Sequence, residues 1–248
     1  MFTWTDVKPL PIDNIIARLQ SRQPFAYSRW CDGEWRAVLG HALGANCDGH
    51  PYSRLLTVEL RAVLEAKPDY WLGIGPLPLR RFPAEIPAYM DAKGLASLDW
   101  RNVRAVDDAL IAATTKGDSA DWLRFLRCLR SLPTLIIGPR HVHPVVHELI
   151  ACEYTIECPL REAFVARREL EAEALSVLQR METPTVVLIS CGMTANILVD
   201  RIWNACNRKH IVYDIGSVWD LYGNVLSRSW MRAADKDKSL TRPVPTAD

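Results

Sequence analysis

The chain has almost no net charge: 30 lysines and arginines face 29 aspartates and glutamates, which leaves +1 with neutral histidine. A protein with so small an excess of charge has no overall field that would collect nucleic acid or an anionic membrane surface. It also lacks any apolar run near the ~18 residues of a membrane span, and residues 1–6 lack the basic and apolar regions of a signal peptide. We therefore expect a soluble, cytoplasmic protein without a membrane span.

Cys-x-x-Cys motifs are absent, although the chain contains seven cysteines. The cysteines are scattered, odd in number and mostly set in apolar runs, which disfavours a structural zinc site and fits reduced thiols in the cytosol. Internal repeats are absent as well. The 248 residues can bury a sizeable core, so we expect one globular unit.

Three histidines in one short stretch, His141, His143 and His147, are the remaining candidates for a metal cluster. The second and third lie four residues apart on an expected helix. No further ligand follows at a conventional zinc spacing, so we interpret the three as helix-surface or cleft histidines.

Strand-like apolar runs alternate with helix-like segments along most of the chain. Apolar residues at helical spacing predict an amphipathic helix over residues 12–21, and further helices are expected after 35, 118, 142, 163 and 195. Strands are predicted at residues 25–30, 70–74, 134–137, 154–158, 185–189 and 211–213. Continuous apolar strands separated by helices indicate an α/β fold with a mostly parallel sheet covered on both faces.

Two segments depart from this pattern. Residues 76–117 include several prolines and few periodic apolar positions, and we expect an irregular insertion there. Residues 233–248 are charged and nearly free of large apolar side chains, which predicts a mobile tail. Residues 1–232 are expected to form the single α/β domain.

The most distinctive segment passes from a buried-strand composition at Phe25 into a turn with two carboxylates, Asp32 and Glu34. We expect the next helix to start at Trp35, so that both carboxylates lie at the end of the strand. Residues two apart in an extended or turning segment project to the same side, and Gly33 between them frees the backbone. Such a pair suits Mg²⁺ or Mn²⁺, which take oxygen ligands together with substrate phosphates. The alternative is an ordinary Asp-Gly turn with a glutamate at a helix start.

Three other predicted strand ends combine glycine with polar or charged residues. They are Gly138-Pro139-Arg140, Ser190-Cys191-Gly192-Met193-Thr194 and Asp214-Ile215-Gly216-Ser217. Ligands of an open parallel sheet bind beyond the carboxyl ends of its strands, and Gly192 before a helix start suits a phosphate. Each loop alone is more often explained by the backbone geometry of a strand-to-helix turn. Together they indicate a nucleotide site.

In order and spacing, these segments resemble the GT-D glycosyltransferases, first described as the domain of unknown function 1792. Residues 27–34 are similar to the family's Arg-Phe-Gly-Asp-Gly-Glu segment, in which an Asp-x-Glu motif holds a divalent metal. The similarity continues at residues 135–138, 156–164 and 187–195 and ends at 213–217. It is weak over the first part of the chain, good over residues 133–222, and absent in the middle.

The resemblance implies a Rossmann-like fold of the GT-D type and sugar transfer from a nucleoside diphosphate sugar, expected to be a UDP-sugar, to an acceptor hydroxyl. Asp32 and Glu34 match the pair that would hold Mn²⁺ or Mg²⁺. Apart from the resemblance, the irregular composition of residues 76–117 leads us to expect an acceptor-side subdomain there. The implied donor-binding residues are Arg29, Gly33, Gly138, Arg140, Cys191, Gly192, Thr194, Asp214, Gly216 and Ser217.

The sequence departs from the family pattern near its end. Ser217 stands where the family tends to have histidine, and the carboxylates that often follow are represented only by Asp220. We therefore predict Asp220 as the general base, with a helix cap or surface aspartate as the alternative. Trp30, Trp35 and Trp219 flank the predicted site and are candidates for stacking on a sugar or a base.

Two alternatives remain open on the sequence alone. A nucleotide-binding module without metal-dependent transfer would use the same glycine-bearing strand ends. The acceptor is either a saccharide or a hydroxylated base in DNA; near-neutral charge disfavours DNA. The alternative of a DNA acceptor stays open because basic residues could contact its phosphates: Arg201, Arg208, Lys209, Arg228 and Arg232.

Overall fold

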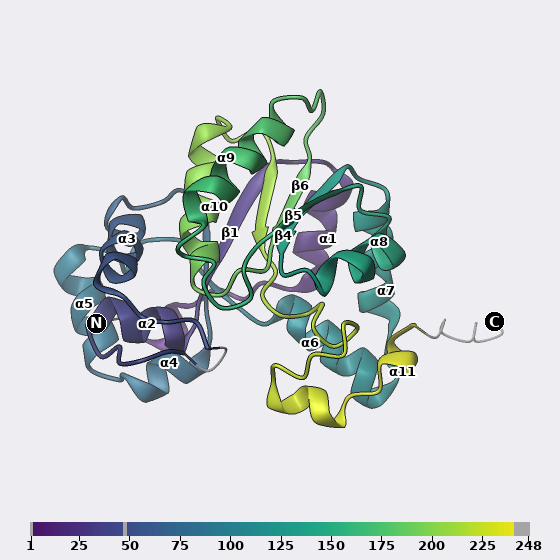
Figure 1. Cartoon of the computed structure of the whole chain (residues 1–248). Helices are drawn as coiled ribbons and strands as arrows, with labels where there is room; N and C mark the ends of the chain where they lie inside the picture. Colours follow the sequence, from purple (N-terminus) through teal and green to yellow (C-terminus); the bar gives the residue numbers. More distant parts are fainter. Residues whose placement is uncertain (1, 47–48, 241–248) are drawn as a thin grey trace.

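The structure, a computed structural model, describes residues 2–46 and 49–240 (Figure 1). Within these residues seven parallel strands form one sheet in the order β3-β2-β1-β7-β6-β4-β5. The strands are β1 (Phe25–Trp30), β2 (Trp71–Ile74), β3 (Trp100–Asn102), β4 (Thr134–Gly138), β5 (Tyr154–Glu157), β6 (Val186–Ile189) and β7 (Ile211–Asp214). The predicted α/β fold with a parallel sheet is confirmed.

Helices cover both faces of this sheet (Figure 1). One face carries α3 (Arg54–Glu65), α9 (Arg167–Leu178) and α10 (Thr194–Ala205), and the other carries α1 (Ile12–Gln20), α6 (Ala105–Ile111), α7 (Ala120–Arg130) and α8 (Val142–Ile150). The remaining elements are α2 (Asp32–Leu39), α4 (Pro76–Arg81), α5 (Glu85–Lys93), α11 (Lys236–Leu240), η1 (Trp4–Asp6), η2 (Ala112–Lys116) and η3 (Ser229–Ala233). In the described part of the chain, no helix combines the length and the apolar composition that a membrane crossing needs.

Each central strand divides its side chains between two hydrophobic cores. In β6, Val187 and Ile189 pack with α9 and α10, whereas Val186 and Leu188 belong to the core on the other face. Successive side chains of a strand point to opposite faces, so a sheet covered on both sides requires unbroken apolar runs. This requirement explains why β6 was predictable from four consecutive apolar residues.

The middle of the chain is more regular than predicted. Pro76 is the first residue of α4 and Pro87 lies in the first turn of α5, positions where proline does not remove a helical hydrogen bond. β3 then pairs with β2 at the edge of the main sheet. The expectation of an irregular insertion over 76–117 is therefore wrong, because these prolines begin helices instead of interrupting them.

The C-terminal segment is ordered further than predicted. Lys236 Nζ donates to Asn224 Oδ1 at 2.9 Å, and the buried Ser239 side chain lies 2.7 Å from the hydroxyl of Tyr222. η3 and α11 thus occupy part of the predicted tail, held by polar contacts that hydropathy does not reveal. The rest of that tail, 241–248, lies outside the described residues.

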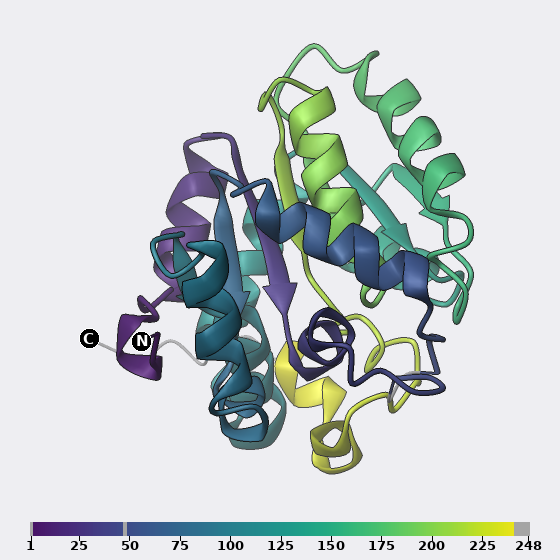
Figure 2. The same cartoon turned by 90° about the vertical axis from the view of Figure 1, so that its left-hand side faces the viewer.

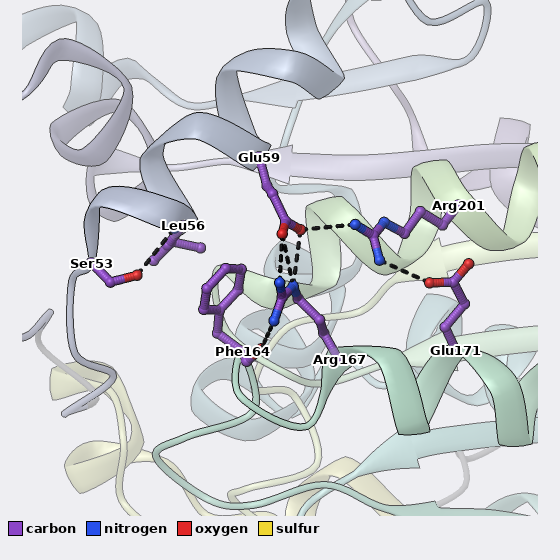
Figure 3. Close-up of polar contacts among 7 residues, drawn as sticks. All are labelled: Ser53, Leu56, Glu59, Phe164, Arg167, Glu171 and Arg201. Atoms are coloured by element: carbon purple, nitrogen blue, oxygen red, sulfur yellow. Dashed lines mark hydrogen bonds and ion pairs between the residues drawn. The ribbon is translucent and has the colours of Figure 1, made fainter.

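A network of four charged side chains joins α3, α9 and α10 (Figure 3). Arg167 Nη2 donates to Glu59 Oε1 at 2.6 Å, and Arg201 Nη2 donates to Glu59 Oε2 at 3.0 Å. Arg201 Nη1 reaches Glu171 Oε2 at 2.9 Å. Only 15% of the Glu59 side chain and 9% of the Arg167 side chain are exposed. Glu59 therefore connects α3, which crosses in front of the sheet in Figure 2, to α9 and α10.

Replacing Glu59 by glutamine should lower the free energy of unfolding by about 3 kcal/mol, because two guanidinium groups lose their shared counter-charge in a largely buried place. Chemical denaturation monitored by circular dichroism measures the change. Asp108→Asn is the control, since it breaks an ion pair with Arg104 in which both side chains are about half exposed, and it should cost less than about 1 kcal/mol. Equal losses in the two variants would contradict the role given to Glu59.

Candidate active site

A cavity of about 660 Å³ lies beyond the carboxyl ends of β4, β6 and β7. The residues that follow β6 and β7 line it through Ser190, Gly192, Gly216 and Ser217. Its other lining residues are Asn46, Gly49, His50, Pro139, His141, Cys158, Pro159, Leu160, Arg161, Asp220, Val225, Leu226, Ser227, Arg228 and Arg232. The chain runs outward from β1 to β3 on one side and places β4–β7 on the other, so the strand order reverses beside this cavity. Open α/β sheets bind their ligands at such a point.

The cavity has an excess of positive charge. Arg161, Arg228 and Arg232 line it, against the single carboxylate of Asp220. Among the residues that the structure describes, neither Arg161 nor Arg232 has an ion-pair partner. Guanidinium groups bind phosphates and carboxylates through paired hydrogen bonds, so this lining favours an anionic ligand.

Two glycines with positive φ bring the backbone close to functional side chains. Gly192 has φ +55°, and a Cβ atom there would lie 2.7 Å from Nε2 of His50. Gly216 has φ +63°, and a Cβ atom there would collide with the guanidinium of Arg29. Larger residues are therefore disfavoured at both positions by the backbone angle and by the space.

Arg29 lies behind the cavity and does not line it. Its Nη2 pairs with Asp107 of α6 at 2.9 Å, and its Nη1 donates to the carbonyl of Ile215 at 3.1 Å. The Arg29 backbone N–H donates to Asp214 Oδ2 at 3.1 Å, while Asp214 Oδ1 accepts from the N–H of Gly216 at 3.0 Å. Arg29 and Asp214 therefore shape the turn after β7, and the predicted contact of Arg29 with a diphosphate is not part of this arrangement.

Asp214 is almost fully buried, and this burial raises its pKa to about 6, against the opposing effects of the Arg29 charge and the two backbone N–H groups. The Asp214 carboxylate therefore serves as a fixed hydrogen-bond acceptor for these backbone N–H groups.

Helix α2 begins at Asp32, three residues earlier than predicted. Residues two apart on an α-helix lie about 200° apart around its axis, so the carboxylates of Asp32 and Glu34 do not face one point. Glu34 turns back, and its Oε2 accepts the N–H of Cys31 at 2.9 Å, while Asp32 pairs with Arg81 of α4. The predicted geometry of this turn is wrong, because Glu34 satisfies a backbone group at the helix start.

Asp32 lines a second, smaller cavity of about 280 Å³ together with Gly33, Tyr52, Arg81 and Asn46. Asn46 also lines the larger cavity, so the two spaces are neighbours. A divalent cation is often held by one or two carboxylates and completed by substrate phosphates. Asp32 supplies the one carboxylate among the described residues that line this space, beside the guanidinium groups of Arg36 and Arg81. Within residues 2–46 and 49–240, no three His, Cys, Asp or Glu side chains form a metal-binding group.

Asp220 and His141 form a hydrogen-bonded pair at the larger cavity. His141 Nε2 lies 2.9 Å from Asp220 Oδ1, and the two side chains are 21% and 12% exposed. His141 precedes α8, and Asp220 lies in the turns that follow β7. His143, two residues further along, is bonded instead to the carbonyl of Gly138 at 3.0 Å. The histidine stretch thus contains one cleft residue paired with a carboxylate.

The other predicted residues fall into three groups. Cys191 and Thr194 are buried behind the Gly192 turn, and Gly138 packs beneath Ser190. Arg140 lines a neighbouring shallow cavity. Trp30, Trp35 and Trp219 are fully buried in the cores, so the predicted stacking on a ligand is wrong.

Sequence reasoning missed His50 and Arg161 as cavity residues. His50 belongs to the loop rich in glycine and asparagine that precedes α3, which is the one signal that it could line a site. Arg228 and Arg232 were considered only as contacts to a nucleic-acid backbone. Cys47 lies outside the described residues.

Solved structures share this fold. One, described as the highly conserved domain of unknown function 1792 with a distinct glycosyltransferase fold, aligns with a TM-score of 0.62 and 16% identity over 88% of this chain and 81% of that chain. Another, described as a new glycosyltransferase of the same domain type from Streptococcus sanguinis, aligns with a TM-score of 0.58 and 15% identity over 87% of this chain and 83% of that chain. No family model and no curated protein matches the sequence. The resemblance predicted from short motifs is confirmed at the level of the fold.

The buried Glu34 predicts a pH effect. Burial raises its pKa from 4.5 to about 7, so between these values the folded protein holds the proton more tightly than the unfolded chain does. In metal-free buffer, the stability of the wild type relative to Glu34→Gln should therefore fall by about 2–3 kcal/mol as the pH rises from 4.5 to 7. Urea denaturation of both proteins across this range measures the difference. A relative stability that rises with pH would show that Glu34 is stabilised as the carboxylate.

Proposed function

We propose that the protein transfers a sugar from a nucleoside diphosphate sugar, with a UDP-sugar as the expected donor, to an acceptor hydroxyl. The observation that carries this proposal is the arginine-lined cavity at the carboxyl ends of β6 and β7, in a chain with a glycosyltransferase fold. Its volume, about 660 Å³, lies within the roughly 300–1,000 Å³ typical of small-molecule sites. Arg161 and Arg232, which have no ion-pair partner among the described residues, would give an anionic ligand the charge that it needs there.

The diphosphate is proposed to lie against the turn at Gly192. This turn leads into α10, a twelve-residue helix whose N-terminus carries partial positive charge. Arg161 and Arg232 supply full charges at the same cavity. When the sugar leaves, negative charge develops on the diphosphate, and donors already in place stabilise that charge without reorganisation.

A divalent cation, Mn²⁺ or Mg²⁺, is proposed to join Asp32 to the donor phosphates. Bound there, it would neutralise charge on the departing diphosphate. Asp32 would exchange Arg81 for the cation, whereas Glu34 would keep its contact with the N–H of Cys31. This assignment narrows the predicted pair of ligands to one carboxylate.

A saccharide hydroxyl is the favoured acceptor. Two basic residues that kept DNA open, Arg201 and Arg208, are held in ion pairs, Arg201 with Glu59 and Glu171 and Arg208 with Asp69. They therefore offer less charge to a phosphate backbone than the sequence suggested. A cytoplasmic location stays part of the proposal, since the six described cysteines are free thiols.

The direct test measures UDP release from a panel of UDP-sugars, with Mn²⁺ or with EDTA, in the presence and absence of saccharide acceptors. We expect one donor to be turned over in a metal-dependent way. Asp32→Asn should weaken the apparent Mn²⁺ affinity by about 100-fold or more, because it removes a charged ligand.

Glu34→Gln is the matched control for Asp32→Asn and should stay within about threefold of the wild type, because glutamine keeps the oxygen that caps α2. Binding of UDP without turnover of any donor would favour a non-catalytic nucleotide-binding module. Equal losses of Mn²⁺ affinity in both variants would restore the two-carboxylate site.

Substitution at Gly192 tests where the donor binds. Gly192→Ala should weaken UDP binding by about tenfold or more, since the new methyl group displaces His50 from the turn that approaches the phosphates. Isothermal calorimetry with UDP measures the affinity. Gly117→Ala is the control: that glycine also has a positive φ, +73°, but nothing lies within 4 Å of its Cβ position. An unchanged affinity in a folded Gly192→Ala protein would contradict the placement.

A further inference from the structure

The pair formed by His141 and Asp220 supplies a proton acceptor inside the cavity. Asp220 Oδ1 and His141 Nε2 are 2.9 Å apart, and both residues line the same space as Gly192 and Gly216. A carboxylate accepts the proton that Nε2 carries, which fixes the neutral imidazole in the tautomer whose Nδ1 bears the lone pair. Among the described residues, Nδ1 has no hydrogen-bond partner.

We propose that His141 is the general base of the transfer reaction and that Asp220 is the residue that positions it. The inference rests on the proposed glycosyltransferase function and replaces Asp220, the base predicted from the sequence. Asp220 faces the imidazole, and only 12% of its side chain is exposed, so its carboxylate is engaged by the histidine and has little access to an acceptor.

His141 and Asp220 account for the proton that the acceptor hydroxyl loses during the transfer. The acceptor hydroxyl gives its proton to Nδ1 of His141, and its oxygen forms a bond to the anomeric carbon of the donor sugar. The bond between that carbon and the phosphate oxygen breaks, and its electron pair leaves with the nucleoside diphosphate. Asp220 stabilises the imidazolium that results. A direct displacement of this kind inverts the anomeric configuration.

The charged groups around His141 come from several segments. Asp220 is its only carboxylate neighbour among the described residues that line the larger cavity, and the arginines there are Arg161, Arg228 and Arg232. The shallow cavity on its other side adds Arg140 and Glu157, and His50 lies across the larger one. Asp220 supplies the counter-charge for the imidazolium that forms during the reaction.

The test uses the UDP-sugar that the wild type turns over, with water or a saccharide as acceptor, and follows UDP release under single-turnover conditions. His141→Gln should lower the rate by about 10²–10⁴, while calorimetric affinity for UDP changes less than about twofold. Asp220→Asn should lower the rate less, again with little change in UDP affinity, because the imidazolium that forms during the reaction loses its counter-charge.

His143→Gln, two residues away in the first turn of α8, is the matched control, and its rate should stay within about threefold of the wild type, since that ring is bonded to the carbonyl of Gly138. Proton NMR of the first sugar released should show the inverted anomer. A His141→Gln rate equal to the wild type, a larger loss in Asp220→Asn than in His141→Gln, or a retained configuration would overturn the assignment and leave the glycosyltransferase function standing. A wild type that turns over no donor would refute the proposed function itself.

Discussion

The buried carboxylate of Asp214 connects the two halves of the sheet at the place where the cavity opens. One oxygen accepts the backbone N–H of Arg29 in β1, and the other accepts the N–H of Gly216 beyond β7. Its burial costs free energy, as the raised pKa of about 6 shows, and the Arg29 charge offsets part of that cost. Because both N–H groups are occupied, the Gly216 turn has one position, and Ser190 completes it by donating to the Gly216 carbonyl.

This arrangement separates residues that build the cavity from residues that face a ligand. Arg29 is engaged with Asp107 and Ile215, so its charge is used inside the protein. Arg161 and Arg232 lie on the segments that surround the opening and are exposed. An anionic ligand would therefore meet arginines from the segments around the opening, while the strand ends supply backbone and small side chains. Such a division is common where a rigid sheet carries its functional residues on loops.

The sheet was predictable because its signal is local. The four apolar residues of β6 and the closely similar run in β4 are all buried only in a sheet covered on both faces. The loops that bear Gly192, Gly216 and Asp220 were predictable for the same reason, since they follow the apolar strands β6 and β7. The roles of single side chains were not, because a hydrogen-bond or ion-pair partner decides each role, and for Arg29 and Asp220 that partner is distant in sequence. Glu34 accepts the N–H of Cys31, Arg29 forms an ion pair with Asp107, and Asp220 is hydrogen-bonded to a histidine 79 residues away.

The most direct measurement is a crystal structure of the protein with UDP and Mn²⁺. The account predicts that the diphosphate lies between the Gly192 turn and the side chains of Arg161 or Arg232, with the cation against Asp32 and with His141 still bonded to Asp220. Binding of UDP in the separate cavity lined by Pro24, Pro184 and residues 205–210, at the amino ends of the strands, would contradict it.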